Sequence, residues 1–218
     1  GIPVAAKDLF YSKGTRTIGG LVVHQEFVPN FDATVIERLE AAGAILVGKL
    51  NLTQGAMAGY HPDFEIPRNP WGKDLWAGAS SSGSGVAVAA GLCFGALGSD
   101  TGGSIRFPSM ANGIVGLKPT YGLVSRHGVL PLAPSFDTVG WFTRSVEDVE
   151  AVRQALVRVP PRSLDDVRIG DLRVGLFKGP DWEKAAAVTR DFIAGAADHL
   201  ARAGAKVTDV PSPAYFTD

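Results

Sequence analysis

The chain has 218 residues, of which 45% are hydrophobic and 20% are charged, and its formal net charge is −1. This length is enough for one domain with a hydrophobic core or for two small domains, and the composition is that of a globular protein. The near-zero charge gives no electrostatic reason to expect nucleic acid or an anionic membrane as a direct partner.

The cysteine content and the apolar runs further restrict the class of protein to which this chain can belong. A single cysteine, Cys93, excludes an internal disulfide framework, and its apolar surroundings predict a buried, unreactive thiol. The longest apolar stretch, from Gly85, is short and interrupted by glycine, so it does not predict a membrane span. No signal peptide is visible at the start, and we expect a cytoplasmic protein. The chain starts at Gly1 inside a predicted strand, so we expect it to be part of a longer protein.

The first half of the chain predicts strands that alternate with helices. Residues 1–10 form a short apolar run with a charged tip, which is typical of a strand. Residues 30–44 predict a helix that Asp32 caps and Gly43 ends. A buried strand is predicted directly after it, at 44–49.

The middle of the chain is punctuated by glycine, proline and serine. Residues 51–78 read as a long loop with one short helix at 52–59. A Gly/Ser cluster then opens a small-residue helix over 86–92, and a strand is predicted at 113–119. Residues 120–140 predict a loop with a short strand.

The last third returns to regular alternation. Ser145 and Asp148 form a capping-box-like start for a helix over 146–159. A strand, a helix and a strand follow at 172–177, 185–204 and 205–210. This order predicts an α/β fold in which helices flank a mixed β-sheet.

The stretch "GSDTGGSIRFPS", from Gly98 to Ser109, is the first candidate for chemistry. Backbone N–H groups around adjacent glycines can form an anion-binding nest. Ser104 follows the two glycines directly, where a nucleophile would place its oxyanion in such a nest. A Gly/Ser-rich surface turn is the alternative for this stretch taken alone.

Other catalytic and ligand-binding motifs fit less well. The segment from Gly43 to Leu50 resembles a phosphate-binding loop, but Leu50 supplies no hydroxyl for Mg²⁺ and the middle is apolar and strand-like. The lipase elbow GxSxG is absent. The four histidines lack ligand spacing, so no metal site is predicted, and a Ser–His–Asp triad stays open without a favoured pairing. Lysine is the other available base, and Lys7 ends an apolar strand where burial would lower its pKa.

Five segments in order carry a resemblance to a known family: "GIPVAAKD", "GASSSGSGVAVAAG", "GSDTGGSIRFPS", "GIVGLKPTYG" and "PLAPSFDTVG". Together they resemble the amidase signature family from Gly1 to about Val149. The segment over 172–210 looks like the strand–helix–strand that follows in these enzymes. The resemblance implies one amidase signature domain over 1–218, incomplete at both ends because family members are longer, with its signature core at 1–149. The chain departs from the family at Ala79, where glycine is frequent.

The family's Ser–cis-Ser–Lys triad falls on Lys7, Ser80 and Ser104. By the same resemblance, the oxyanion hole would be the backbone N–H groups of Thr101, Gly102, Gly103 and Ser104. Asp100 and Arg106 would brace the loop, Ser81 and Ser82 would either orient the serine segment or fill it, and Asp137 would be structural.

The resemblance implies an amide hydrolase that forms an acyl-enzyme on serine, uses a small-molecule amide substrate and needs no cofactor. Two alternatives remain. One is the glutaminase subunit of a glutamyl- or aspartyl-tRNA amidotransferase, and the other is a non-catalytic amidase fragment. The sequence leaves the oligomeric state open, a homo-oligomer included.

Overall fold

A five-stranded mixed sheet forms the centre of the first part of the chain, with strand order β2-β1-β3-β5-β4. The strands are β1 (Ile2–Lys7), β2 (Ala44–Leu50), β3 (Gly95–Asp100), β4 (Val115–Leu117) and β5 (Thr138–Thr143). β1 pairs in parallel with β2 and β3, whereas β5 pairs antiparallel with β3 and β4. The computed structural model describes residues 1–57, 59–157, 160 and 166–213.

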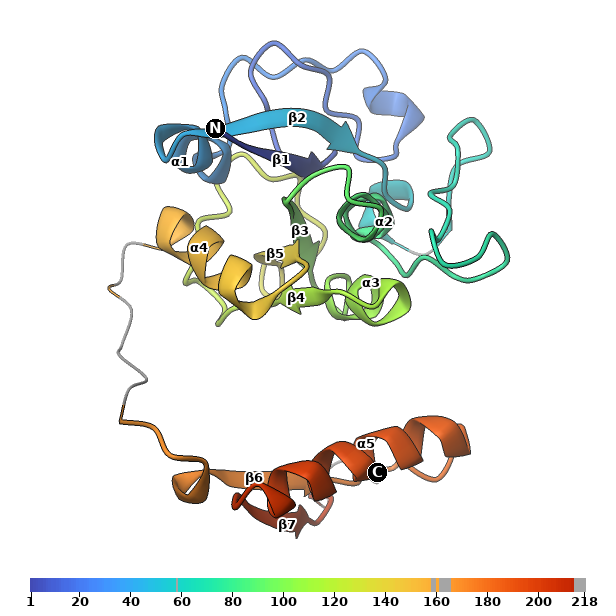
Figure 1. Ribbon diagram of the computed structural model, residues 1–218. Coiled ribbons are helices and arrows are strands. Elements are labelled where there is room, and N and C mark those ends of the chain that lie inside the picture. The colour runs from blue at the N-terminus through green and yellow to red at the C-terminus, as the bar shows by residue number, and fades with distance from the viewer. Residues whose placement is uncertain (58, 158–159, 161–165, 214–218) are drawn as a thin grey trace. The chain divides into compact units, whose positions relative to one another are not determined.

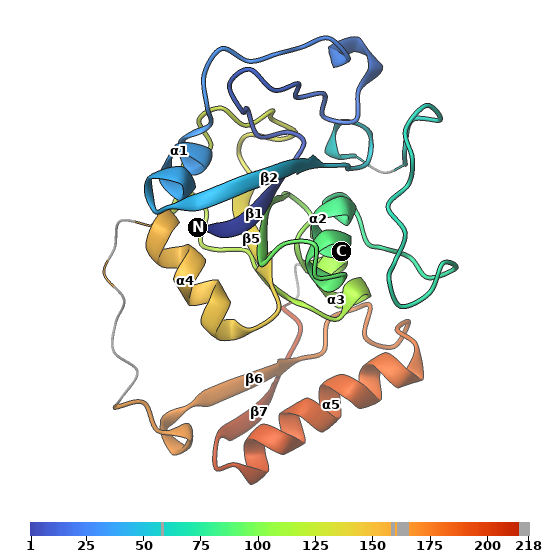
Figure 2. The ribbon, with the colours of Figure 1, turned by 45° about the horizontal axis from the view of Figure 1, so that its top comes forward.

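Helices cover both faces of this sheet (Figures 1 and 2). They are α1 (Thr34–Ala41), α2 (Ser82–Ala89), α3 (Arg106–Asn112) and α4 (Val146–Leu156), with 3₁₀ turns at Val22–His24 and Gln54–Ala56. α1 and α4 lie on one side of the sheet and α2 and α3 on the other. The expected α/β class with a mixed sheet is confirmed.

Strand alternation divides the core between the two faces. In β1, Val4 and Ala6 belong to the buried cluster that also contains side chains of α1 and α4. Ala5, between them, belongs to a second cluster with Val88 of α2 and Ile105. β1 is therefore covered on both sides, and a residue at its C-terminal end is enclosed by protein.

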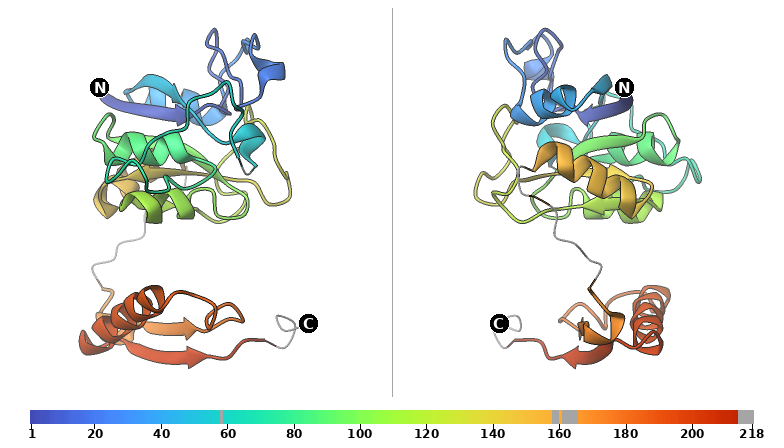
Figure 3. Two further views of the ribbon diagram at one scale, coloured as in Figure 1. Left: turned by 90° about the vertical axis from the view of Figure 1, so that its right-hand side faces the viewer. Right: turned by 60° about the vertical axis from the view of Figure 1, so that its left-hand side comes forward.

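A second compact unit spans Pro161–Asp218, after the first at Gly1–Pro160. Its described elements are a 3₁₀ turn (Ile169–Asp171), β6 (Arg173–Phe177), α5 (Ala187–Arg202) and β7 (Lys206–Val210). β6 and β7 are parallel and α5 connects them, as Figure 3 shows. The strand–helix–strand that the sequence predicts at 172–210 is thus present.

Several local expectations are confirmed. Ser145 is the N-cap of α4, and its hydroxyl accepts a hydrogen bond from the Asp148 N–H at 3.1 Å. α4 ends at Leu156, and residues 158–159 of the predicted helix lie outside the described residues. Cys93 is buried, and burial raises the pKa of its thiol to about 11.

Other local expectations were wrong. Ala33, not Asp32, is the N-cap of α1, because the Asp32 carboxylate accepts a hydrogen bond from the Lys13 N–H instead. The predicted buried strand is β2, which is an edge strand with Ile45 and Val47 each 54% exposed. An apolar run does not reveal whether its strand will be paired and covered on both sides.

The helix predicted over 86–92 is α2, which already begins at Ser82, inside the Gly/Ser cluster, and ends at Ala89. The sequence prediction missed β3 and α3, which lie just before and just after the glycine loop. β3 has the sequence GALGSD, with little intrinsic strand preference, and is stabilised by pairing with β1 on one side and β5 on the other.

Candidate active site

The carboxyl ends of two neighbouring parallel strands form the centre of the site. Lys7 is the last residue of β1, and Ser99 is the next-to-last residue of β3. Because β1 and β3 are parallel, these ends lie at the same edge of the sheet. This is the edge at which open α/β sheets commonly bind their ligands.

The Lys7 side chain is fully buried at this edge. Its Nζ lies 2.6 Å from Ser80 Oγ and 2.9 Å from Ser99 Oγ, within hydrogen-bonding distance of both. Burial lowers the pKa of Lys7 to about 7, although the negative charges of Asp100 and Asp137 act in the opposite direction. The amine is therefore able to lose and regain a proton near neutral pH.

The serine segment before α2 is held beside both β3 and the glycine loop. The peptide bond between Ala79 and Ser80 is cis. The N–H of Ser81 donates to the carbonyl of Ser104 at 3.3 Å, and the Ser81 hydroxyl donates to the carbonyl of Ser99 at 3.2 Å. These two bonds bring the segment that carries Ser80 next to Ser104.

Gly78 allows this segment to approach α3 closely. Its φ is +79°, in the left-handed region that favours glycine, and a Cβ there would lie 2.3 Å from the Cα of Pro108. The close contact is with backbone atoms, so a flexible side chain cannot relieve it. The glycine before the serine cluster is therefore required by both conformation and space.

The Asp100 carboxylate organises the loop that carries Ser104. It accepts hydrogen bonds from the N–H groups of Gly103 at 2.9 Å and Ile105 at 3.1 Å, and from Arg106 Nε and Nη2 at 3.1 and 2.9 Å. Burial acts to raise the pKa of Asp100, but the hydrogen bonds from Arg106, Ile105 and Gly103 hold it below its usual range. Asp100 stays ionised and ties the two ends of the loop together.

The four backbone N–H groups expected around an oxyanion are not equivalent. The Gly103 N–H is already bonded to Asp100. In the described parts of the chain, no hydrogen bond is found for the N–H groups of Thr101, Gly102 or Ser104. These three remain the candidate donors to a bound oxyanion.

Asp137 ties the glycine loop to the segment before β5. Its carboxylate accepts hydrogen bonds from the hydroxyl of Thr101 at 2.6 Å and from the N–H groups of Leu132 at 2.9 Å and Ala133 at 3.0 Å. These contacts agree with the structural role that the sequence indicates for Asp137.

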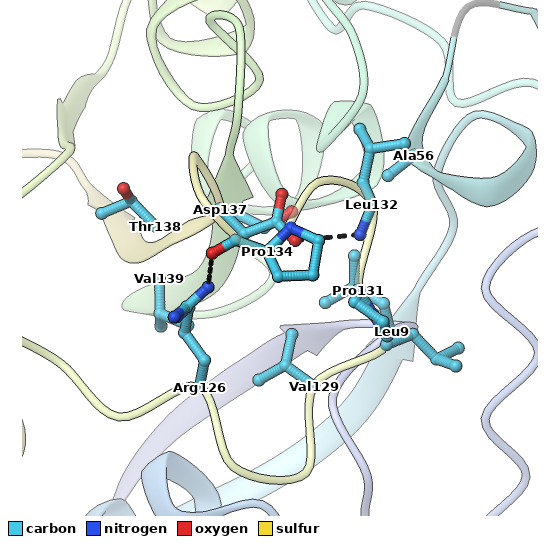
Figure 4. Close-up of a pocket in the computed structure, with 12 residues that line it drawn as sticks. Leu9, Ala56, Arg126, Val129, Pro131, Leu132, Pro134, Asp137, Thr138 and Val139 are labelled. Atoms are coloured by element: carbon cyan, nitrogen blue, oxygen red, sulfur yellow. Dashed lines mark hydrogen bonds between the residues drawn. The ribbon is translucent and has the colours of Figure 1, made fainter. Parts of the chain in front are cut away.

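Figure 4 shows a cavity of the first unit, with a volume of about 260 Å³. Ser99 is one of its lining residues and contacts Lys7 Nζ. The cavity wall is mainly apolar and includes Leu9, Val129, Leu130, Pro131, Leu132 and Val139. Ser99 and Asp137 add polar groups, and Arg126, also in the wall, donates a hydrogen bond to the carbonyl of Pro134. Ser99 therefore belongs both to the cavity wall and to the surroundings of Lys7.

Ser99 is the site residue that the sequence analysis missed. It directly precedes Asp100 in the same motif, but the strand that directs it towards Lys7 was not predicted. Recognition of a strand over 95–100, parallel to the strand that ends at Lys7, is the signal that would have found it.

Three of the four histidines contact an aromatic ring. Ring contacts join His24 to Phe27, His61 to Phe64 and His127 to Phe31. Among the described residues, none of the hydrogen bonds joins a histidine to Ser104, and no cluster of three or more His, Cys, Asp or Glu side chains suits a metal ion. Over the same residues, no helix combines the length and apolar character that a membrane span needs.

Comparison with known proteins finds relatives over most of the chain. A family model described as Amidase matches residues 1–216. The "Putative amidase AmiD" of Mycobacterium tuberculosis is 46% identical over 206 residues, which cover 91% of this chain and 43% of that protein.

Two solved structures are similar over nearly the whole chain. One is a subunit of the glutamyl-tRNA(Gln) amidotransferase from Thermotoga maritima, which superposes with a TM-score of 0.88 at 34% identity, over 96% of this chain and 50% of that one. The other is the peptide amidase from Stenotrophomonas maltophilia, with a TM-score of 0.84 at 36% identity, over 96% and 47%. The chain thus spans about half the length of these relatives or less.

Proposed function

The chain belongs to the amidase family, and from this premise we propose that it is the catalytic part of an amide hydrolase with Ser104 as nucleophile. The observation that carries the proposal is the buried Lys7 amine, with a pKa of about 7, at 2.6 Å from Ser80 Oγ. The backbone bond from Ser81 to Ser104, at 3.3 Å, supports a relay from Ser104 through Ser80 to Lys7.

In this proposal the neutral Lys7 amine accepts the proton of the Ser80 hydroxyl, while Ser80 accepts the proton of Ser104. Ser104 Oγ attacks the amide carbonyl carbon and forms a tetrahedral intermediate. The C–N bond then breaks, and the proton held by Lys7 returns through Ser80 to the leaving nitrogen. Water hydrolyses the resulting ester, which releases the carboxylic acid and restores Ser104.

The N–H groups of Thr101, Gly102 and Ser104 are the proposed donors to the oxyanion of this intermediate. Gly103 would have to exchange its bond to Asp100 in order to join them. One such donor is worth about 3–4 kcal/mol in the transition state of comparable enzymes. Asp100 and Arg106 support the reaction by holding the loop, without touching the substrate.

The substrate we propose is a small-molecule amide that enters beside the apolar cavity wall. We also propose that the signature core at 1–149 and the segment at 172–210 are parts of one amidase domain. The match of the family model over 1–216 supports this.

The proposal is tested by treating the chain with an arylsulfonyl fluoride, measuring the intact mass and mapping the adduct by peptide sequencing. We expect one adduct on Ser104, no adduct in Ser104→Ala and none in Lys7→Ala. Cooperative thermal unfolding of each variant is the control for folding. A folded chain that gives no adduct would contradict an active site made of these residues and would favour the non-catalytic fragment.

A glutaminase subunit is the second candidate function, favoured by the TM-score of 0.88 to the T. maritima amidotransferase subunit. The two candidates are separated by substrate. Release of ammonia from glutamine, with no turnover of simple aliphatic or aryl amides, would support the glutaminase. Turnover of simple amides without glutaminase activity would support the independent amidase.

A further inference from the structure

The amine of Lys7 has a second partner that the proposed relay leaves unused. Ser99 Oγ lies 2.9 Å from Lys7 Nζ, and the Ser99 residue is 7% exposed. Within the described residues, the hydrogen bonds of Nζ go to Ser80 and Ser99. The amine thus lies between one hydroxyl on the serine segment and one on β3.

When Lys7 is neutral, its contacts with Ser80 and Ser99 have different roles. A neutral amine has two N–H donors and one lone pair, and only the lone pair can accept the proton of Ser80. Rotation about the last carbon–nitrogen bond moves the lone pair away from Ser80 unless another group holds an N–H. Ser99 Oγ is the acceptor in position to hold it.

Ser99 is itself well fixed. It pairs with Val139 in the antiparallel register of β3 and β5, and its carbonyl accepts the hydroxyl of Ser81 at 3.2 Å. A hydroxyl attached to this backbone cannot follow the lysine if the amine turns. Its position is therefore set by the sheet and not by the serine segment.

We propose that Ser99 is a positioning residue, whose hydroxyl accepts an N–H of Lys7 and so directs the amine lone pair at Ser80. The same hydroxyl stabilises the ammonium formed once Lys7 has taken the proton, because a charged donor makes the stronger hydrogen bond. This inference rests on the proposed function of Lys7 as the base.

The test is the pH profile of Ser104 sulfonylation in the full chain, compared between substitutions at Ser99. Ser99→Ala removes the acceptor, so the rate on the alkaline plateau falls by about 10- to 100-fold through lost alignment. The acid limb of the profile is the range in which the rate falls because Lys7 becomes protonated. Loss of an acceptor for the ammonium moves this limb to lower pH, by about 0.5–1 unit. The carboxylates that act on Lys7 from neighbouring segments, Asp100 and Asp137, stay unchanged in these variants.

Two further variants separate the hydroxyl from packing. Ser99→Thr and Ser99→Val have nearly the same shape and differ in the hydroxyl, and β-branched residues suit a strand. We expect Ser99→Thr to keep the acid limb of the wild-type pH profile. Ser99→Val should behave like Ser99→Ala. Ser84→Ala is the matched control, because the Ser84 hydroxyl is also buried and bonds to the carbonyl of Leu97 on the same strand, away from Lys7.

An acid limb and plateau that are the same in Ser99→Val and Ser99→Thr would overturn the inference while the proposed function stands. A limb that shifts equally in Ser84→Ala would also overturn it, because the effect would then be structural. If the wild-type chain is not sulfonylated at Ser104, the proposed function fails, and the inference falls with it.

Discussion

Lys7 Nζ and Ser80 Oγ lie 2.6 Å apart, although 73 positions of sequence separate the two residues. Lys7 ends the strand that is covered on both faces, and Ser80 precedes the first turn of α2. The fold thus encloses an amine beside a hydroxyl, and within the described ranges the amine bonds to hydroxyl groups and not to a carboxylate. Burial of this amine is the cause of its low pKa.

The rate of Ser104 sulfonylation is expected to fall on the acid side of an inflection near pH 7, which is the pKa of Lys7. Below this pH the amine holds a proton and cannot accept one from Ser80, so the rate falls about tenfold for each pH unit. The measurement is the inactivation rate constant between pH 5 and about 9. A profile flat through pH 7 would contradict Lys7 as the base.

The stability of the fold is also expected to depend on Lys7. The pKa of this amine is about 7 in the folded state and 10.5 for an ordinary lysine, so between these values folding releases a proton. Since the unfolded state binds more protons in this window, the free energy of unfolding rises with pH, by at most about 1.4 kcal/mol per unit from this group. Urea denaturation of the wild type and Lys7→Met at several alkaline pH values measures the difference.

Lys7→Met retains a long side chain and removes the titrating group. The free energy of unfolding of this variant should therefore lack the rise with pH that Lys7 causes. Because other groups titrate in both proteins, the difference between the two curves isolates Lys7. Parallel curves would show that the amine does not lose its proton on folding.

Asp100→Asn should weaken the loop that carries Ser104. The carboxylate accepts from Gly103, Ile105 and Arg106, and an amide keeps one acceptor oxygen. We expect a loss of about 1–3 kcal/mol in the free energy of unfolding, with slower sulfonylation. Because the Asp100 charge raises the pKa of Lys7, its removal should move the acid limb to lower pH.

Arg106→Gln is the control for the ion pair alone. It leaves the Asp100 bonds to the backbone N–H groups of Gly103, Ile105 and Arg106 in place, so it should reduce stability and rate less than Asp100→Asn. An effect of equal size in the two variants would show that the ion pair, rather than the backbone bonds, holds the loop.

Gly78→Ala is expected to destabilise the chain by more than about 3 kcal/mol, because it adds a backbone clash to an unfavourable φ. The added Cβ would meet Pro108 Cα at 2.3 Å. Gly122→Ala is the matched control, since its φ is +80° and its Cβ would meet nothing within 4 Å, so about 1 kcal/mol is expected. Equal melting temperatures for the two variants would show that close approach to α3 is not required.

The helix over 146–156 and the strand–helix–strand at 172–210 could be predicted from sequence because their signals are local. A cap such as Ser145 acts on an N–H three residues away, and an apolar period is read within one element. The predictions that failed concern β3 and β2, whose structure depends on contacts with distant segments. β3 has a glycine-rich sequence and is formed by pairing with its neighbours, and β2 is half-exposed because it lies at the edge of the sheet.

The same division applies to the site. The family resemblance and the triad candidates Lys7, Ser80 and Ser104 follow from the sequence alone, because short motifs preserve the types of residues that the chemistry needs. The folded structure was needed to show that Lys7 is fully buried, that the Gly103 N–H donates to Asp100 and that Ser99 contacts the amine. Burial and hydrogen-bond partners depend on segments that are distant along the chain, and these contacts set the pKa on which the proposed reaction depends.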